Sequence, residues 1–229
     1  MIKSRYIELL ANLFDGVKGF KQQVGITPSM HLVQGALYLL YRLIHGSDYL
    51  CCVAEEHAGV IESLVALSKF QRQRVEDQKT HFLTIDIRET ADKCLIEIWN
   101  NNGQDDKQNM INDLRFVQLI IERMSTCGES EEESERIRLK VLEMFESVLF
   151  QTHEGYYLFP EFPALQKSVD EGIEDAGGIE EFESLIFIVD HWNLEELVLE
   201  SKTIKEVISN GMIEYFNQIS RNIINSPYS

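Results

Sequence analysis

Prolines are rare in this chain of 229 residues, and this constrains its fold more than any other feature. They are Pro28, Pro160, Pro163 and Pro227. Residues 29–159 therefore contain none, which favours α-helix because proline disrupts helix interiors. After Thr27-Pro28, which resembles an N-cap followed by proline at the first helical position, apolar residues recur three and four apart as far as Gly46. We expect a helix there that ends at this glycine.

The same periodicity continues along the rest of the chain. Further helical patterns cover about 2–14, 53–69, 89–99, 109–124, 134–151, 164–174, 178–190, 194–199 and 203–224. Residues 81–87 alternate weakly and are the one candidate strand, without an obvious pairing partner. We therefore predict an all-α protein that forms a single domain over 1–229. Its connectors or insertions are expected near 71–88, 100–106, 128–135 and 151–165.

The charge balance narrows the classes of partner. With 21 Lys+Arg against 38 Asp+Glu, the net charge is -17, while 44% of the residues are hydrophobic. The apolar content suffices for a buried core. The acidity argues against nucleic acid and against anionic membrane surfaces, both of which attract clustered Lys and Arg. Protein or peptide partners are the class left by this argument.

Targeting signals and cysteines indicate the compartment. The first ten residues mix Lys3, Arg5 and Glu8 with apolar residues, which is unlike a secretory signal, and no apolar run is long enough to span a membrane. The four cysteines, Cys51, Cys52, Cys94 and Cys127, have no disulfide or zinc spacing and are expected to be reduced. We expect a protein of the cytoplasm or nucleus.

A short segment recurs along the chain with the pattern G-x-I-E-x-(Leu/Phe). Its copies begin at Gly59, Gly177 and Gly211. In each copy the glycine can end one helix and turn the chain sharply, and the next helix then begins with apolar residues. The distance along the chain between the first two copies equals three periods of about 39 residues. A period of this length lies in the range of helical solenoid repeats.

These residues resemble the armadillo repeat family, and within it the C-terminal half of importin-alpha. The resemblance is carried by His57–Leu67 and by Glu174–Leu185, and it extends over roughly residues 30–216. It implies a right-handed α-solenoid, an armadillo- or HEAT-like superhelix, of about four to five irregular repeats. No single repeat can bury its own apolar face, so several must stack.

In importin-alpha, Trp and Asn four residues apart on the third helices clamp lysine-rich peptides. The matching positions here are Tyr38 and Arg42, Lys93 and Glu97, and Glu143 and Ser147. None of them is Asn, and two carry positive charge, so the resemblance implies a groove of different specificity. We expect a non-enzymatic protein-binding scaffold or adaptor that contacts its partner through these six residues. A divergent nuclear import adaptor that binds basic cargo peptides is the alternative.

Motifs that would carry catalysis are not found. The sequence has no zinc-ligand spacing, no phosphate-binding loop and no nucleophile elbow. It predicts no enzyme activity, no cofactor and no metal site, although a catalytic helical domain without a recognisable motif is a third interpretation. Trp99 and Trp192 are expected in the core.

An aromatic cluster and the C-terminal end are the other candidate contact regions. The cluster comprises Tyr156, Tyr157, Phe159 and Phe162, and it is interpreted either as a loop over the core or as an anchor for a partner. The pattern that begins at Gly211 runs into the C-terminus as an incomplete repeat. We therefore expect a subunit of a larger assembly, or a homo-oligomer formed through that end.

Overall fold

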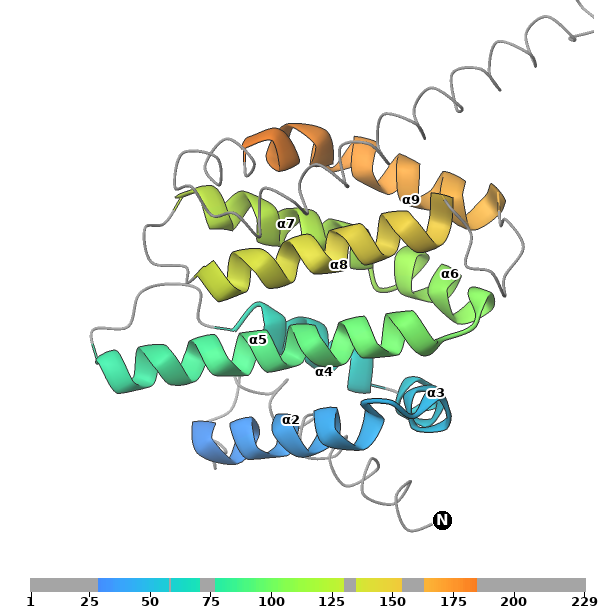
Figure 1. Cartoon of the computed structure of the whole chain (residues 1–229). Coiled ribbons are helices and arrows are strands. Elements are labelled where there is room, and N and C mark those ends of the chain that lie inside the picture. Colours follow the sequence, from blue (N-terminus) through green and yellow to red (C-terminus); the bar gives the residue numbers. More distant parts are fainter. Residues whose placement is uncertain (1–28, 58, 71–76, 130–134, 154–162, 185–229) are drawn as a thin grey trace, which may run out of the picture.

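The computed structural model describes residues 29–57, 59–70, 77–129, 135–153 and 163–184. Within these ranges the chain forms only α-helices and the turns between them, which confirms the all-α class. Figure 1 shows their arrangement. The helices are α2 (Met30–Ile44), α3 (Asp48–Glu56), α4 (Val60–Ser68), α5 (Gln78–Asn101), α6 (Gln104–Asn112), α7 (Phe116–Glu129), α8 (Glu135–His153) and α9 (Pro163–Asp175). A further helix begins at Gly178.

Helix lengths follow a short, short, long order that occurs twice. Helices α3 and α4 have 9 residues each and are followed by α5 with 24. Helices α6 and α7 have 9 and 14 residues and are followed by α8 with 19. In Figure 1 the long helices α5 and α8 lie side by side, with α2 on the other side of α5. Helix α4 packs on α5, and α7 packs on α8.

Two of the recurrent glycines occupy equivalent places in this arrangement. Gly59, with φ 94°, separates α3 from α4, and Gly177, with φ 67°, separates α9 from the helix that begins at Gly178. A left-handed backbone at a helix junction strongly favours glycine, because a Cβ atom clashes there. The repeated motif therefore marks the same helix-to-helix turn at both positions. The third copy, at Gly211, lies outside the described residues.

Several boundaries differ from the sequence prediction. The candidate strand at 81–87 is wrong, because these residues lie inside α5, and the connector expected at 71–88 extends too far for the same reason. The patterns at 53–69 and 109–124 each join two helices, which break at Gly59 and at Arg115, a residue with φ 51°. Helix α2 begins at Met30, after Ser29, rather than at Pro28, and it ends before Gly46 as expected.

The hydrophobic core runs continuously from α2 to the helix after Gly178. Trp99 is fully buried, as expected, and its ring packs on Phe116 with centroids 5.5 Å apart. Phe145 of α8 packs on Phe182 in the same manner, with centroids 5.6 Å apart. These aromatic pairs link α5 to α7 and α8 to the helix that begins at Gly178.

A buried polar cluster links α4, α5 and α7. The side chains of Asp92 and Arg123 are 0% exposed, and Arg123 Nη2 donates to Asp92 Oδ2 at 3.4 Å. The hydroxyl of Ser68 donates to the other oxygen of the Asp92 carboxyl group. Burial raises the pKa of Asp92, and the guanidinium groups of Arg123 and Arg88 counteract this effect. Opposite charges so deeply buried must be matched across helices.

We predict that Asp92→Ala lowers the free energy of unfolding by about 3–5 kcal/mol, because it leaves Arg123 buried without its carboxylate. Urea denaturation measures the loss, and Asp113→Ala, at an exposed carboxylate, is the matched control. The double replacement Asp92→Leu/Arg123→Met should be less destabilising than Asp92→Leu alone. A loss for Asp92→Ala no larger than for Asp113→Ala would show that the pair does not hold these helices together.

Candidate partner-binding face

A pocket of about 310 Å3 lies between α2 and α5. Its lining residues are His31, Gln34, Gly35 and Tyr38 of α2, and Asp86, Glu89, Thr90 and Lys93 of α5. On both helices these positions repeat at three- and four-residue spacing, so each helix presents one continuous edge to the pocket. Gly35 has no side chain to fill the pocket, and a Cβ atom at this position would meet no heavy atom within 4 Å.

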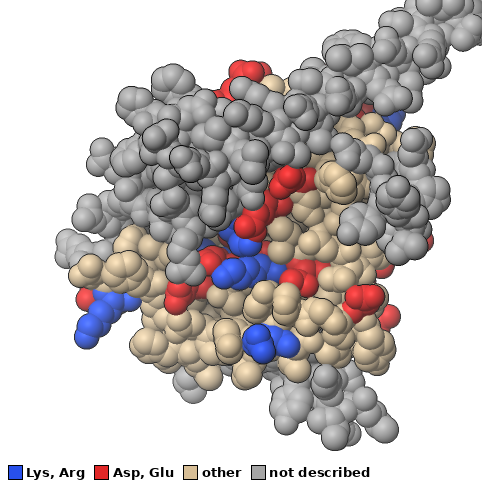
Figure 2. All heavy atoms as spheres, in the orientation of Figure 1, with Lys and Arg blue, Asp and Glu red and all other residues tan. Residues whose placement is uncertain are grey.

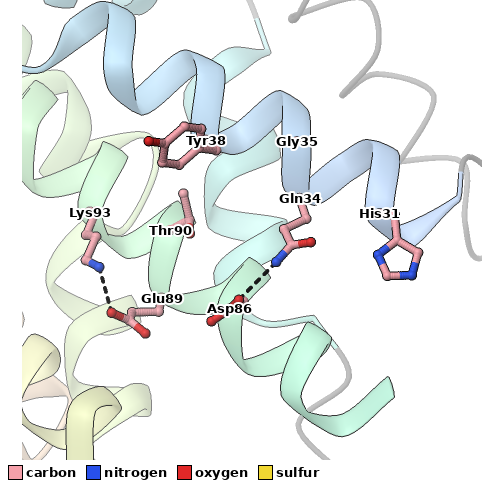
Figure 3. A pocket seen from close by; sticks show the side chains of 8 residues that line it. All are labelled: His31, Gln34, Gly35, Tyr38, Asp86, Glu89, Thr90 and Lys93. Carbon is pink, nitrogen blue, oxygen red and sulfur yellow. Dashed lines mark hydrogen bonds and ion pairs between the residues drawn. The ribbon is translucent and has the colours of Figure 1, made fainter. Parts of the chain in front are cut away.

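Hydrogen bonds and one ion pair order the walls of the pocket. The Gln34 amide nitrogen donates to Asp86 Oδ2 at 2.9 Å, which joins α2 to α5. Lys93 Nζ donates to Glu89 Oε1 at 2.6 Å, one turn apart on α5. Figure 3 shows Tyr38 over Thr90, with the Gln34–Asp86 pair on one side and the Lys93–Glu89 pair on the other. The pocket thus offers an aromatic surface between two ordered polar groups.

A row of polar side chains, which we call the polar row, runs from this pocket toward α8. His45 of α2 contacts Glu97 of α5, with Nδ1 and Oε1 2.6 Å apart. Asn100 at the end of α5 accepts hydrogen bonds at Oδ1 from Ser147 at 2.5 Å and from the Gln151 amide at 2.6 Å. We call the surface formed by these residues and the pocket the α2–α5–α8 face. Its side chains are mostly amides, hydroxyls and paired charges.

The six residues expected to contact a partner lie on the three helices of this face. Tyr38, which is 58% exposed, and Lys93 line the same pocket. Glu97 and Ser147 belong to the polar row. Arg42 is exposed in the last turn of α2, and Glu143 forms an ion pair with Lys140 within α8.

Sequence reasoning missed several residues of the face. Gln34, Asp86, Glu89 and Thr90 lie three, four or seven residues from Tyr38 or Lys93, and this helical spacing was the available signal. The aromatic cluster of Tyr156, Tyr157, Phe159 and Phe162 lies outside the described residues, as does Trp192.

Charges of both signs are distributed over this surface. Figure 2 shows basic and acidic side chains close together over α5, while α2 is covered mainly by uncharged residues. Arg42 is the only Lys, Arg, Asp or Glu of α2. The face therefore does not carry the uniform acidity that the net charge of -17 would suggest.

Among the cysteines in the described part of the chain, Cys51 and Cys94 are buried, whereas Cys52 is half-buried. The thiols of Cys51 and Cys94 are buried and donate to backbone carbonyl groups. Burial raises the pKa of both, that of Cys51 to about 12, so neither forms the thiolate that a nucleophile requires. The described residues contain no cluster of three His, Cys, Asp or Glu that could hold a metal ion.

Lys107 of α6 is a buried amine with a perturbed pKa. It is 6% exposed, and its Nζ donates to Gln151 Oε1 at 2.6 Å and lies 5.5 Å from the centre of the Trp99 ring. Burial lowers its pKa to about 8. It contacts α8 and does not line the α2–α5 pocket.

Comparisons with protein-family models, with curated proteins and with solved structures found no match to this chain. In the described ranges, no helix is both long and apolar enough to cross a membrane. The geometry of the α2–α5–α8 face is therefore the basis of the function proposed below.

We predict that Lys107 makes the protein more stable at high pH than at neutral pH. Between its folded pKa of about 8 and its ordinary value of 10.5, the unfolded chain binds more protons than the folded one, so stability rises with pH. Relative to Lys107→Met, the wild type should gain about 1–2 kcal/mol across this window, after allowance for solvent screening. Chemical denaturation as a function of pH measures the gain.

The matched control is Lys167→Met, since the Lys167 side chain is 66% exposed. Its difference from the wild type should not change with pH over the same range. If Lys107→Met and the wild type show parallel stability curves, the Lys107 ammonium group is solvated and its pKa is not lowered.

Proposed function

We propose that the chain is an irregular, right-handed armadillo-like solenoid that acts as a non-enzymatic protein-binding scaffold or adaptor within a larger assembly. The short, short, long order of α3–α5 and of α6–α8 supports the repeat architecture. The left-handed glycines Gly59 and Gly177 support it as well, because they turn the chain at equivalent places. In such an architecture the long helices form an extended surface on which a partner chain can lie.

The observation that carries the binding proposal is the polar row that crosses from α2 through α5 to α8. It begins at Gln34 and Asp86 and ends at Asn100, Ser147 and Gln151. An extended peptide has backbone N–H and C=O groups without internal partners, so amide and hydroxyl side chains along a row can bind its backbone. Tyr38 adds an exposed aromatic surface of the kind that concentrates binding energy at interfaces.

The mixture of charges favours a partner of mixed or low charge. Arg42 and Lys93 would repel a uniformly basic segment, and Glu97 and Glu143 would repel a uniformly acidic one. The Lys93–Glu89 ion pair already neutralises part of this surface. Specificity would then come from the order of side chains along the α2–α5–α8 face more than from the net charge of that face.

We predict that peptides selected from a random displayed library on the full-length protein bind this face. Tyr38→Ala and Lys93→Glu should each weaken such peptides about 10-fold or more, equivalent to about 1.4 kcal/mol. Isothermal titration calorimetry measures the change. Tyr49→Ala and Lys167→Glu are the controls, because Tyr49 is 67% exposed on α3 and Lys167 is exposed on α9. Equal losses for pocket and control variants would reject the face as the binding site.

A divergent nuclear import adaptor that binds basic cargo is the second candidate, and one observation favours it. Asp86 lines the pocket, and its hydrogen-bond partner is the neutral amide of Gln34, so its charge is not compensated by that contact. A lysine or arginine side chain of a partner could pair with this carboxylate.

If the protein is an import adaptor for basic cargo, a lysine-rich peptide should bind to it saturably in a fluorescence anisotropy titration. Its affinity should fall with salt, and Asp86→Asn should weaken it at least about fivefold, because the variant removes the charge and keeps the shape. Asp105→Asn on α6 is the control, because Asp105 is exposed and does not line the pocket. Absence of saturable binding at low salt rejects the import-adaptor function and leaves the scaffold proposal intact.

A further inference from the structure

A buried cation lies behind the α8 end of the polar row. In Figure 1, α6 lies beside the last turns of α5 and α8, and Lys107 of α6 is buried there. Its Nζ donates to Gln151 Oε1 at 2.6 Å and lies 5.5 Å from the centre of the ring of Trp99, which precedes Asn100 in α5. Burial lowers its pKa only to about 8, so the amine is mostly protonated at neutral pH. Lys107 is then a hydrogen-bond donor that cannot accept.

This cation fixes the direction of the hydrogen bonds at this end of the row. Because an ammonium group only donates, the amide of Gln151 turns its Oε1 toward Lys107 and its Nε2 away. Nε2 then donates to Asn100 Oδ1 at 2.6 Å and to Ser147 Oγ at 3.4 Å. The Ser147 hydroxyl accepts from Gln151 and donates its own hydrogen to Asn100 Oδ1 at 2.5 Å. Two hydrogen bonds therefore meet at the carbonyl oxygen of the Asn100 amide.

The nitrogen of the Asn100 amide is left for a partner. Asn100 is exposed, and within the described part of the chain no group accepts a hydrogen bond from its Nδ2. An amide nitrogen donates and does not accept, so this end of the row selects an acceptor. Glu97 lies one turn before Asn100 on α5, and Glu143 lies one turn before Ser147 on α8. Their charges disfavour a carboxylate from the partner and favour an uncharged carbonyl oxygen.

We propose that Lys107 is a positioning residue, which acts through Gln151 to hold Asn100 with its amide nitrogen outward, as a donor to a backbone carbonyl oxygen of a bound peptide. This inference rests on the proposed function of the α2–α5–α8 face and adds a hydrogen-bond direction at its α8 end. Without the cation, the Gln151 and Asn100 amides could turn together, and either end of Asn100 could face the partner. Packing alone does not need the charge, because an apolar side chain of similar size avoids the cost of burying an ammonium group.

Gln151→Glu tests the direction in the free full-length protein, because it keeps an acceptor for Lys107 and removes the donor to Asn100. The urea midpoint should not fall, since the introduced carboxylate pairs with the ammonium group. Asn100 should turn its Nδ2 toward that carboxylate. By NMR, the side-chain amide hydrogens of wild-type Asn100 should exchange with water at least about 10-fold faster than those of Gln151, and they should become protected in the variant. Protection of Asn100 already in the wild type would overturn the proposal.

Isothermal titration calorimetry with the selected peptides measures the effect on binding. Gln151→Glu and Lys107→Met should each weaken these peptides about 5-fold or more, as expected for the loss of one hydrogen bond. Neither should have a further effect in the Asn100→Ala background, since both act through Asn100. Asn109→Ala, at an exposed asparagine of α6 outside the row, is the matched control and should leave the affinity unchanged. Equal losses in the wild-type and Asn100→Ala backgrounds would assign the effect to charge or stability and overturn the proposal.

The inference and the proposed function fail in different ways. If no binding peptide is selected, or if Tyr38→Ala leaves the affinity unchanged, the α2–α5–α8 face does not bind peptides and both fail together. If Tyr38→Ala weakens the peptides while Gln151→Glu does not, the face binds them without the direction that Lys107 imposes, and only the inference fails.

Discussion

The buried ion pair between Asp92 and Arg123 fixes how the two groups of three helices, α3–α5 and α6–α8, pack on each other. We call these groups the first and the second triplet. Asp92 lies in α5, at the end of the first triplet, and Arg123 lies in α7, in the middle of the second. Ser68 adds a hydrogen bond from α4 to the same carboxyl group. Apolar side chains tolerate small shifts along a helix axis, but a buried charge that loses its partner is strongly unfavourable. The pair therefore selects one register of α5 against α7.

The register of α5 in turn determines which side chains form the α2–α5–α8 face. With Asp92 and Cys94 directed into the core, Glu89 and Lys93 fall on the edge that meets α2, together with Asp86. One turn further, Glu97 reaches His45, and the last turn brings Asn100 to Ser147. A single long helix thus provides contacts to the helices on both of its sides. The face is a consequence of how α5 is buried.

The sequence predicted those parts of the fold that depend on local chemistry. Proline-free apolar periodicity was sufficient for the all-α class, and Gly59 and Gly177 marked helix junctions because the left-handed backbone favours glycine. Helix α5 was misjudged at its start, where Thr84 and Arg88 are buried although both are polar. Their burial weakens the apolar periodicity, so residues 81–87 resembled a strand. Further along α5, the charge that pairs with Asp92 comes from Arg123 of α7, 31 residues away in the sequence, so local periodicity does not indicate that Asp92 is buried.

The candidate site was predictable to the same extent. The resemblance to armadillo repeats selected Tyr38 and Lys93, which line the pocket from α2 and from α5. The pairing of Gln34 with Asp86 depends on the distance between α2 and α5, which local patterns do not contain. The charge of a residue in the sequence likewise did not indicate whether its side chain is exposed or buried. Lys107 and Arg123 look like solvent-exposed cations in the sequence, yet both are buried, one against Trp99 and one against Asp92.

The compositions of α2 and α5 contribute differently to the pocket. Among Lys, Arg, Asp and Glu, α2 has only Arg42, so its pocket edge carries none of these charges before the last turn. The pocket edge, with Gln34 and Tyr38, can exchange water for the polar groups of a partner at little cost. The carboxylates and the lysine that line the pocket come from α5, so the charge preference of the pocket is determined by α5, while α2 contributes its aromatic surface and its shape.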